Sequence, residues 1–507
     1  MDTTQKEFLG HPKGLYVLFF TEMWERFSFY GMKALLIYYL IQHHFFTDSA
    51  GNLQVGSYAA LVYAMPVLGG YLADRYLGFR KAVIFGAVLL VLGHLGMAYE
   101  GTKAVEVDGV IRRDETALQF FYFSLALIIM GVGFLKANIS SIVGTLYEKQ
   151  DIRKDSAFTI FYMGINLGSM LATLLCGWLG SKYGWAYGFG AAGLGMLLGL
   201  IVFLKGQKHF IGKAEPPDPL LLQKKVGGII STENFIYLAS LLGTFVVWQI
   251  IQRHSVVGGI LLVSGILSLV LIGWHAIKLD KVARDQLIAL TILILFSVIF
   301  WALFEQAYTS LSLFAERALN RQFLWFEFEP GQVSFFNAFF IVLFAPVFAW
   351  IWIRLTKLKA NPNTVVKFSL ALIFAGLGFG ILLLGGQMSG EGKVAFTWII
   401  LMYMLHTFGE LCLSPVGLSS VTKLSPVKIV GFMMGVWFLA TAGSEYIAAL
   451  LANIASLDHS GDQSANLAVA KASYMNLFEY LFYTGLISGA VLLILSPLIK
   501  KLMHGVK

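Results

Sequence analysis

Fourteen apolar runs divide this chain, and they constrain its fold more than any other feature of the sequence. An α-helix of about 20 apolar residues crosses the ~30 Å hydrocarbon core of a bilayer. The chain is 57% hydrophobic and only 13% charged, whereas soluble domains carry about 25% charged residues. The sequence therefore predicts an all-α polytopic membrane protein. Its helices are expected at residues 15–41, 53–74, 81–99, 117–138, 156–180, 184–204, 232–251, 256–276, 286–314, 331–353, 365–386, 395–421, 428–453 and 474–499.

The spacing groups these helices as six, two and six. A polar linker rich in lysine and proline, residues 205–231, follows the first six. We predict a six-helix bundle over residues 1–210 and a second one over residues 284–507. Residues 211–283 would form a cytoplasmic linker and an inserted helix pair at about 232–276. Because that pair carries few polar groups, we expect it to pack outside any path through the bundles.

The positive charges indicate how the chain lies in the membrane. Lys and Arg are concentrated in alternate loops, on the side that also holds both termini, and such an excess marks the cytoplasmic side. The net charge of +8 is therefore explained by orientation signals, and no nucleic-acid partner is expected. Residues 1–14 are polar and lead directly into the first helix, so no cleavable signal peptide is predicted.

Cofactors and enzymatic chemistry have no support in the sequence. Cys176 and Cys412 both lie in apolar runs and predict no disulfide framework. Neither metal-ligand spacing, nor a phosphate-binding glycine loop, nor a nucleophile elbow is present. We expect a protein that is not an enzyme and needs no cofactor.

The first predicted helix carries ionisable residues on one face. At 100° per residue they fall within an arc of about 140°. Charges at membrane depth usually face a bundle interior, an ion path or a partner charge. We predict that this stripe lines a polar cavity; the alternative is a single ion pair, Glu22 to Arg26, that only stabilises the helix. The residues of the stripe are Glu22, Glu25, Arg26, Phe29, Tyr30 and Lys33.

Two motifs carry a family resemblance. Residues 22–31 read E-x-x-E-R-F-x-F-Y-G, and residues 161–169 read F-Y-x-x-I-N-x-G-S. Both resemble signatures of the proton-dependent oligopeptide transporter (POT/PTR) family, within the major facilitator superfamily. A glycine-rich segment with Asp74 and Arg75 is similar to the loop 2–3 motif of that superfamily. The resemblance covers essentially the whole chain and implies a major facilitator fold, with two six-helix bundles around a midplane site.

The resemblance also implies roles for individual residues. Lys136 and Glu410 would bind opposite ends of a peptide and pair as a gate, although Lys136 could instead reach the membrane surface. Lys33 and Glu305 would form a second gate. The implied proton-coupling residues are Glu22, Glu25, Arg26, Glu305 and Glu410. The implied substrate-binding residues are Arg26, Tyr30, Lys33, Tyr63, Lys136, Asn166, Trp301, Glu305, Asn337, Glu410, Trp437 and Thr441.

The chain departs from the family pattern at several positions. Lys33 stands where many members have arginine, and Phe29 where many have tyrosine. Phe304 occupies a position that is acidic in some members. Gly56 stands where animal members have a proton-linked histidine, so carboxylates must carry the coupling.

The resemblance implies a proton-coupled symporter that imports di- and tripeptides by alternating access. Its partners would be peptide, protons and the lipid bilayer, and its location a bacterial inner membrane; the oligomeric state stays open. The alternative is a transporter of another small solute on the same fold, such as nitrate, a glucoside or an amino-acid derivative. A nutrient receptor without net transport is a further alternative, which the retained carboxylates disfavour.

Overall fold

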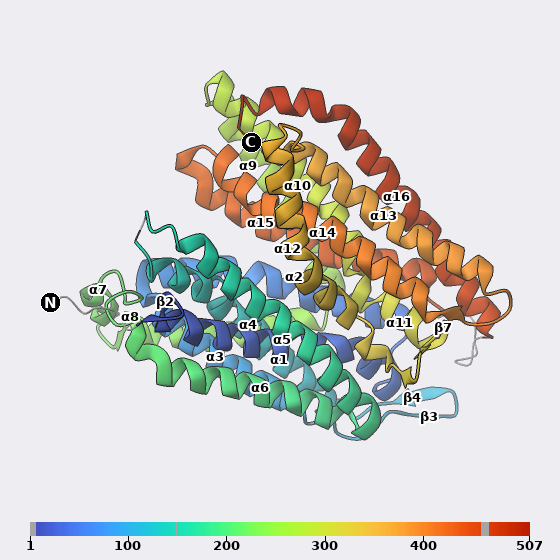
Figure 1. Cartoon of the computed structure of the whole chain (residues 1–507). Coiled ribbons are helices and arrows are strands. Elements are labelled where there is room, and N and C mark those ends of the chain that lie inside the picture. Colours follow the sequence, from blue (N-terminus) through green and yellow to red (C-terminus); the bar gives the residue numbers. More distant parts are fainter. Residues whose placement is uncertain (1–6, 149, 458–465, 507) are drawn as a thin grey trace. The chain divides into compact units, whose positions relative to one another are not determined.

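Long α-helices form nearly all of this molecule in the computed structural model, which describes residues 7–148, 150–457 and 466–506 (Figure 1). Residues 1–6 and 507, which the predicted domains include, lie outside the described part. Cα packing divides the chain into two compact units. Unit 1 comprises the chain up to Phe45 together with Leu61–His254, and unit 2 comprises Phe46–Ala60 together with Ser255–Lys507.

Unit 1 contains the first long helices and the second part of α2. Its elements are β1 (Glu7–Phe8), β2 (His11–Pro12), α1 (Lys13–Tyr38) with a π-helical end (Tyr39–His43), α2 (Asp48–Leu72) from residue 61 with a π-helical end (Ala73–Leu77), α3 (Phe79–Met97), β3 (Val105–Val107), β4 (Val110–Arg112), α4 (Glu115–Thr145), α5 (Lys154–Tyr183), α6 (Trp185–Gly206) with a 3₁₀ turn (Gln207–His209), α7 (Pro219–Gln223), β5 (Lys225–Val226), β6 (Ile230–Ser231) and α8 (Thr232–Ile251).

Unit 2 contains the first part of α2 and the remaining helices. Its further elements are α9 (His254–Ile277), α10 (Lys281–Phe304), a 3₁₀ turn (Glu305–Tyr308), α11 (Ser310–Arg317), β7 (Leu319–Asn320), β8 (Gln322–Phe323), β9 (Phe326–Glu327), a 3₁₀ turn (Pro330–Gln332), α12 (Phe335–Lys357), α13 (Thr364–Met388), β10 (Val394–Ala395), α14 (Phe396–Leu424), a 3₁₀ turn (Val427–Ile429), α15 (Val430–Ala452), a 3₁₀ turn (Asn453–Ala455) and α16 (Leu467–Leu502). The strands form short two-stranded ladders, and among the described residues only the β7–β10 ladder is parallel.

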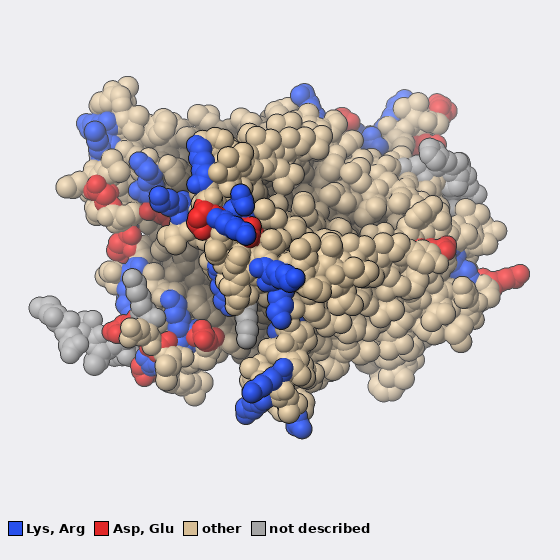
Figure 2. All heavy atoms as spheres, turned by 90° about the horizontal axis from the view of Figure 1, so that it is seen from above, with Lys and Arg blue, Asp and Glu red and all other residues tan. Residues whose placement is uncertain are grey.

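The helices meet the requirements for membrane spans that the sequence predicted. Among the described residues, 13 helices are long and apolar enough to cross a bilayer. The 26-residue α1, with its ionisable stripe, is the additional long helix. Figure 2 shows wide areas of the visible surface that carry no charged side chain. The predicted all-α membrane architecture is confirmed.

Glycines let neighbouring helices of unit 1 approach backbone to backbone. A Cβ added at Gly69 of α2 would lie 2.1 Å from the carbonyl oxygen of Gly133 in α4, so no larger residue fits there. This glycine belongs to the segment that resembles the loop 2–3 motif. Its role in the structure is close helix packing.

The two inserted helices belong to different units. The α8 helix packs on α4, where Gln119 donates to Gln252 and Phe123 contacts Trp248. The α9 helix belongs to unit 2, where a Cβ at Gly258 would lie 2.6 Å from the Tyr446 hydroxyl of α15. Packing thus divides the chain at residues 254 and 255, between the two helices. The domain boundaries expected at 210 and 284 stay a prediction.

Candidate functional site

The charged stripe of α1 forms a buried ion triad within one helix. Arg26 Nε lies 2.8 Å from Glu22 Oε1 and 2.9 Å from Glu25 Oε2. All three residues are at most 5% exposed. Positions i, i+3 and i+4 share one face of a helix, so the geometry follows from the local sequence. The ion pair expected between Glu22 and Arg26 is therefore present, and Glu25 forms a second ion pair with the same guanidinium.

The helix α5 packs directly on this triad. A Cβ at Gly168 would lie 2.2 Å from the Met23 carbonyl oxygen and 3.1 Å from Arg26 Cβ. The glycine of the second motif is therefore what allows α5 to reach α1 at the depth of the triad. Two residues earlier, the Asn166 side chain is buried and donates to the Tyr162 carbonyl at 3.0 Å. The two motifs of the resemblance thus meet in space.

Lys136 lies well inside α4, and this corrects the expectation that it belongs to the last turns of that helix. The helix continues to Thr145, which at 1.5 Å per residue lies roughly 14 Å further on. The Lys136 Nζ atom sits 3.7 Å from the centroid of the Tyr63 ring of α2. The predicted substrate residues Lys136 and Tyr63 are therefore in contact through a cation–π interaction.

The other two α1 residues assigned to substrate stay close to the stripe. Lys33 is buried, with its Nζ 5.9 Å from the centroid of the Phe29 ring. The Tyr30 ring packs edge-on against Phe29 at 5.1 Å. Lys33 lies in unit 1 and Glu305 in unit 2. The gate predicted between Lys33 and Glu305 therefore stays a prediction. The gate predicted between Lys136 and Glu410 stays a prediction for the same reason.

In unit 2 a carboxylate is held by a neutral donor. Glu410 Oε2 of α14 accepts a hydrogen bond from Asn337 Nδ2 of α12 at 3.1 Å. The same amide nitrogen lies 3.2 Å from the Thr407 hydroxyl. The structure thus brings together Asn337 and Glu410, two predicted site residues far apart in the sequence. Within the described part of unit 2, no lysine or arginine forms an ion pair with Glu410.

The predicted membrane helix of residues 286–314, the first of the second six-helix bundle, is not one continuous α-helix. Helix α10 ends at Phe304, a 3₁₀ turn follows from Glu305, and Thr309 (φ −129°, ψ −99°) separates this turn from α11. A 3₁₀ stretch inside a helix often marks a hinge. Glu305 is therefore placed where the α-helix gives way to the 3₁₀ turn. One turn earlier, the buried Trp301 Nε1 has no hydrogen-bond partner among the described residues.

Trp437 and Thr441 occupy one face of α15. The Trp437 ring packs over Gly417 of α14, where an added Cβ would lie 2.5 Å from Cη2. The Thr441 hydroxyl donates to the Trp437 carbonyl at 3.1 Å. Its proton is thus used within its own helix, and its oxygen is the atom left to accept a bond from a ligand.

One buried ion pair was missed by the sequence reasoning. Asp48, at the start of α2, accepts from Arg317 Nη1 at 2.6 Å and from Nη2 at 2.7 Å. The Leu457 backbone N–H and the Tyr474 hydroxyl complete this network. In the sequence, Asp48 reads as a helix-start residue and Arg317 as a helix-end residue, both common in helices. No local signal indicates that these residues meet.

The structure explains the absence of a histidine at position 56. A Cβ there would lie 2.4 Å from Ala449 Cβ and 3.0 Å from the Glu445 carbonyl oxygen of α15. Because glycine has no side chain, this part of α2 can pack tightly against α15 within unit 2. A histidine-based proton route at this position is sterically excluded.

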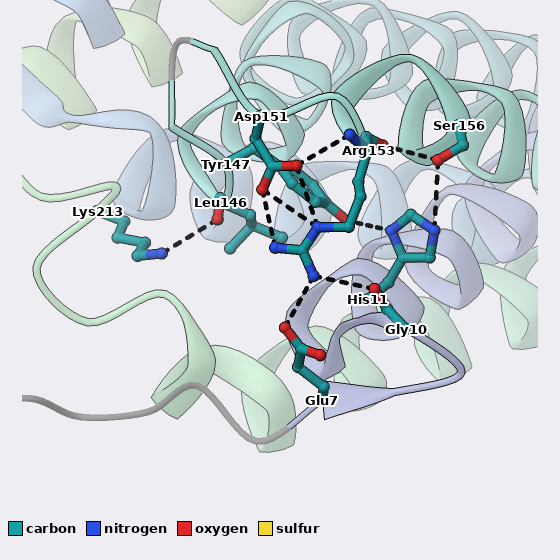
Figure 3. A network of polar contacts seen from close by, with 9 residues as sticks. All are labelled: Glu7, Gly10, His11, Leu146, Tyr147, Asp151, Arg153, Ser156 and Lys213. Atoms are coloured by element: carbon teal, nitrogen blue, oxygen red, sulfur yellow. Dashed lines mark hydrogen bonds and ion pairs between the residues drawn. The ribbon is translucent and has the colours of Figure 1, made fainter.

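A second polar network ties the start of the chain to the ends of α4 and α5 (Figure 3). Arg153 contacts Asp151 at 2.8 Å and Glu7 of β1 at 2.8 Å. Hydrogen bonds from the Arg153 guanidinium lower the pKa of Asp151 to about 2. His11 Nδ1 lies 2.8 Å from the Tyr147 hydroxyl, which fixes β2 on α4. The network positions the N-terminal hairpin and contains none of the predicted site residues.

The described residues contain no group of three His, Cys, Asp or Glu side chains that could hold a metal ion. The buried functional groups are carboxylates, cations, amides and aromatic rings. Such a set binds charged organic groups and protons.

Fold and site together define a polytopic membrane protein with ionisable side chains buried among its helices, as in membrane transporters. The chain belongs to the POT family, whose model matches residues 80–466. The uncharacterized transporter YclF of Bacillus subtilis (strain 168) is 38% identical over 512 residues, covering 99% of this chain and 97% of the relative. The di-/tripeptide transporter of Lactococcus lactis subsp. cremoris is 35% identical over 531 residues, covering 100% and 99%.

A solved structure has the same fold. The crystal structure of peptide transporter POT in complex with sulfate is 35% identical, has a TM-score of 0.80 and covers 99% of this chain and 98% of the other. The predicted family and the major facilitator type of fold are thereby confirmed. The named relatives are called transporters.

Proposed function

We propose that this protein is a proton-coupled symporter that imports di- and tripeptides by alternating access. The relatives named above support the substrate class, since one is called a di-/tripeptide transporter and another a peptide transporter. The alignments cover nearly the whole of this chain and of each of these relatives. The bacterial source of the named relatives and the positive loops support a location in a bacterial inner membrane, with both termini in the cytoplasm.

The single observation that carries the proposal is that unit 1 holds cations inside its membrane helices, whereas unit 2 holds a carboxylate without an ion-pair partner within the described part of that unit. Unit 1 buries the cation Arg26 and carries Lys136 on a tyrosine face. Unit 2 holds the carboxylate Glu410 with the neutral amide of Asn337. A zwitterionic dipeptide presents a carboxylate and an ammonium group. Its carboxylate could therefore bind a cation of unit 1, and its ammonium group could bind Glu410 of unit 2. Charge-assisted hydrogen bonds would make both contacts stronger than neutral ones.

Proton coupling is assigned to the carboxylates. Glu22, Glu25, Glu305 and Glu410 lie inside or at a break of membrane helices, where a charge must be paired or take up a proton. In this mechanism proton uptake breaks an ion pair of a gate, either Lys33 with Glu305 or Lys136 with Glu410. A bias of a few kcal/mol between the two states is enough to switch the populations.

Proteoliposomes with an imposed pH gradient test the proposal directly. Labelled dialanine should accumulate inside when the gradient is inward, and unlabelled dialanine should compete. Acetylation of the dipeptide amine or amidation of its carboxylate should weaken competition strongly, because buried charged groups would then lack a partner. Side-chain changes should matter less, because the proposed walls are aromatic.

The same assay separates the alternatives. Competition by nitrate with no effect of dipeptides would assign another solute to this fold. Dialanine binding without accumulation under a pH gradient would indicate a receptor. If end-blocked dipeptides compete as well as free ones, the substrate is not recognised as a zwitterion and the peptide assignment fails.

A further inference from the structure

The β5–β6 hairpin lies where the chain enters a membrane helix. It ends at Ser231, and α8 begins at the next residue. The 20 residues of α8 span about 30 Å, which is just the thickness of the hydrocarbon core. The whole helix is therefore needed to cross the bilayer. It follows that the hairpin sits at the level of the lipid headgroups.

The hairpin is fixed to the start of α8 and presents its tip outward. The Thr232 backbone N–H and hydroxyl donate to the Lys224 carbonyl at 2.8 and 2.9 Å. Gly227 and Gly228 adopt φ of +60° and +75°, a left-handed turn that favours glycine. The next residue, Ile229, is 82% exposed. A large apolar side chain is thus held rigidly away from the protein.

Two lysines flank this apolar tip. Lys224 and Lys225 are exposed, and neither forms an ion pair among the described residues. We define Lys224, Lys225, Val226 and Ile229 as the hairpin patch. The side of α8 that points away from α4 continues this surface with exposed residues such as Leu238 and Leu242. Neutral apolar surface and positive charge therefore occur together at headgroup depth.

The acidic residues near the hairpin are already engaged. Glu215 pairs with Arg80 at 2.8 Å, and Glu233 pairs with Lys81 at 2.6 Å. Asp218 caps α7 by accepting from the backbone N–H groups of Leu220 and Leu221. None of these carboxylates is left to neutralise the lysines of the patch. The linker is also bound to unit 1, since Lys213 donates to the carbonyl of Leu146, the residue that follows α4 (Figure 3).

We propose that the hairpin patch binds anionic phospholipid at the leaflet where α8 begins. Lys224 and Lys225 contact the lipid phosphates, and Ile229 inserts among the upper methylene groups. Complementary charge and exposed apolar area both favour this partner, since basic residues near a membrane surface attract anionic lipid. The contact would anchor the linker between the bundles to the leaflet.

Native mass spectrometry of the detergent-solubilised full-length protein tests this proposal, with phosphatidylglycerol and phosphatidylcholine as probes. The parent should bind phosphatidylglycerol more tightly than phosphatidylcholine, and more weakly as the salt concentration rises. The variant K224Q/K225Q should lose about tenfold in affinity for phosphatidylglycerol. Ile229→Ser should weaken binding of both lipids.

The matched control is K500Q/K501Q, which removes two adjacent exposed lysines at the end of α16. It changes the net charge by the same amount as K224Q/K225Q. Its affinity for phosphatidylglycerol should stay within about twofold of that of the parent, because the electrostatic effect of a basic residue is local. Equal affinity of the parent for the two lipids would overturn the proposal. So would an equal loss in the control, or no loss in K224Q/K225Q.

A second measurement does not depend on loss of binding. An environment-sensitive fluorophore on I229C reports the polarity around the tip, because the native Cys176 and Cys412 are buried and resist labelling. Its emission should shift to shorter wavelength in nanodiscs with phosphatidylglycerol, relative to phosphatidylcholine alone. Identical spectra in the two nanodiscs would contradict insertion of the tip.

Discussion

The buried charge cluster of unit 1 and that of unit 2 are built in opposite ways. In unit 1, Arg26 forms ion pairs with both Glu22 and Glu25 within one stretch of a single helix. In unit 2, Glu410 is held by the amide of Asn337, 73 residues away on another helix. The first cluster contains its own cation and the second does not. A counter-charge for Glu410 must therefore come from outside its own cluster, as a proton, a lysine or a substrate ammonium group.

This difference teaches how the two clusters depend on the rest of the molecule. The triad forms as soon as α1 is helical, because its three side chains share one turn. The Asn337–Glu410 contact exists only when α12 packs against α14. Mutations in the two clusters should therefore fail in different ways.

The largest effect is expected from Arg26→Gln. This substitution removes the cation of the triad and leaves Glu22 and Glu25 buried without it, which costs about 3–5 kcal/mol in unfolding free energy. Uptake should be abolished and thermal stability should fall. The triple variant E22Q/E25Q/R26Q, which buries no charge in the triad, should recover stability but not proton-driven uptake. A stable Arg26→Gln protein would show that the triad is not buried in the membrane.

Glu410→Gln tests the other cluster. The amide keeps the shape and still accepts from Asn337, so stability should stay near that of the parent. Proton-driven accumulation of dialanine should vanish, while counterflow survives. Discrimination against acetylated dialanine should drop about tenfold or more, since a neutral group no longer requires an ammonium partner. Lys136→Ala is the matched variant for the other end, with a loss of discrimination against amidated dialanine. Unchanged selectivity in both variants would contradict the assigned roles.

The Asp48–Arg317 pair is expected to have the next largest effect. Hydrogen bonds to charged groups contribute about 1.5–3 kcal/mol each, and the Arg317 side chain is partly screened at 23% exposure. Asp48→Asn should therefore lower the unfolding free energy by about 2 kcal/mol. A double-mutant cycle with Asp48→Ala and Arg317→Ala measures the coupling. Additive effects of the two substitutions would show that the pair contributes nothing.

A smaller effect on function is expected from deletion of the inserted pair. A chain that joins residue 210 to residue 284 through a flexible linker lacks α8 and α9. It therefore loses the packing of α8 on α4 and of α9 on α15. It should melt at a lower temperature, because the Phe123 ring of α4, which contacts two aromatic side chains of α8, becomes uncovered. Dialanine binding should persist, since none of the predicted site residues is removed. A well-folded, monodisperse deletion that fails to bind dialanine would place the pair in the site.

The smallest effect is expected from Arg153→Gln in the N-terminal network. The pKa of Asp151 is lowered from 3.8 to about 2 in the folded protein. Its contribution to stability is thus fully present above pH 4, declines as the pH falls toward 2, and is absent below. In the variant, hydrogen exchange at residues 7–12 should be faster at neutral pH and lose its acid dependence. Uptake should match the parent, and a loss of uptake would tie this network to transport.

The sequence by itself determined the membrane helices and the charged triad of α1. Its motifs also identified the family. Runs of about 20 apolar residues must span a membrane whatever the packing, and positions 22, 25 and 26 meet in any helix. It also indicated Glu410 and Asn337 as site residues through the resemblance. The segment 286–314 was predicted as a single helix, because its hydropathy carries no sign of the turn at Glu305.

Tertiary structure alone decided the contacts that join distant segments. Asp48 and Arg317 lie 269 residues apart, and each has an ordinary local role as a helix-end residue. Packing also decided that Lys136 lies deep within α4 and that α8 and α9 belong to different units. The physical reason is that backbone periodicity acts over about four residues. Partners on separate helices are selected by steric fit and by the need to neutralise buried charge.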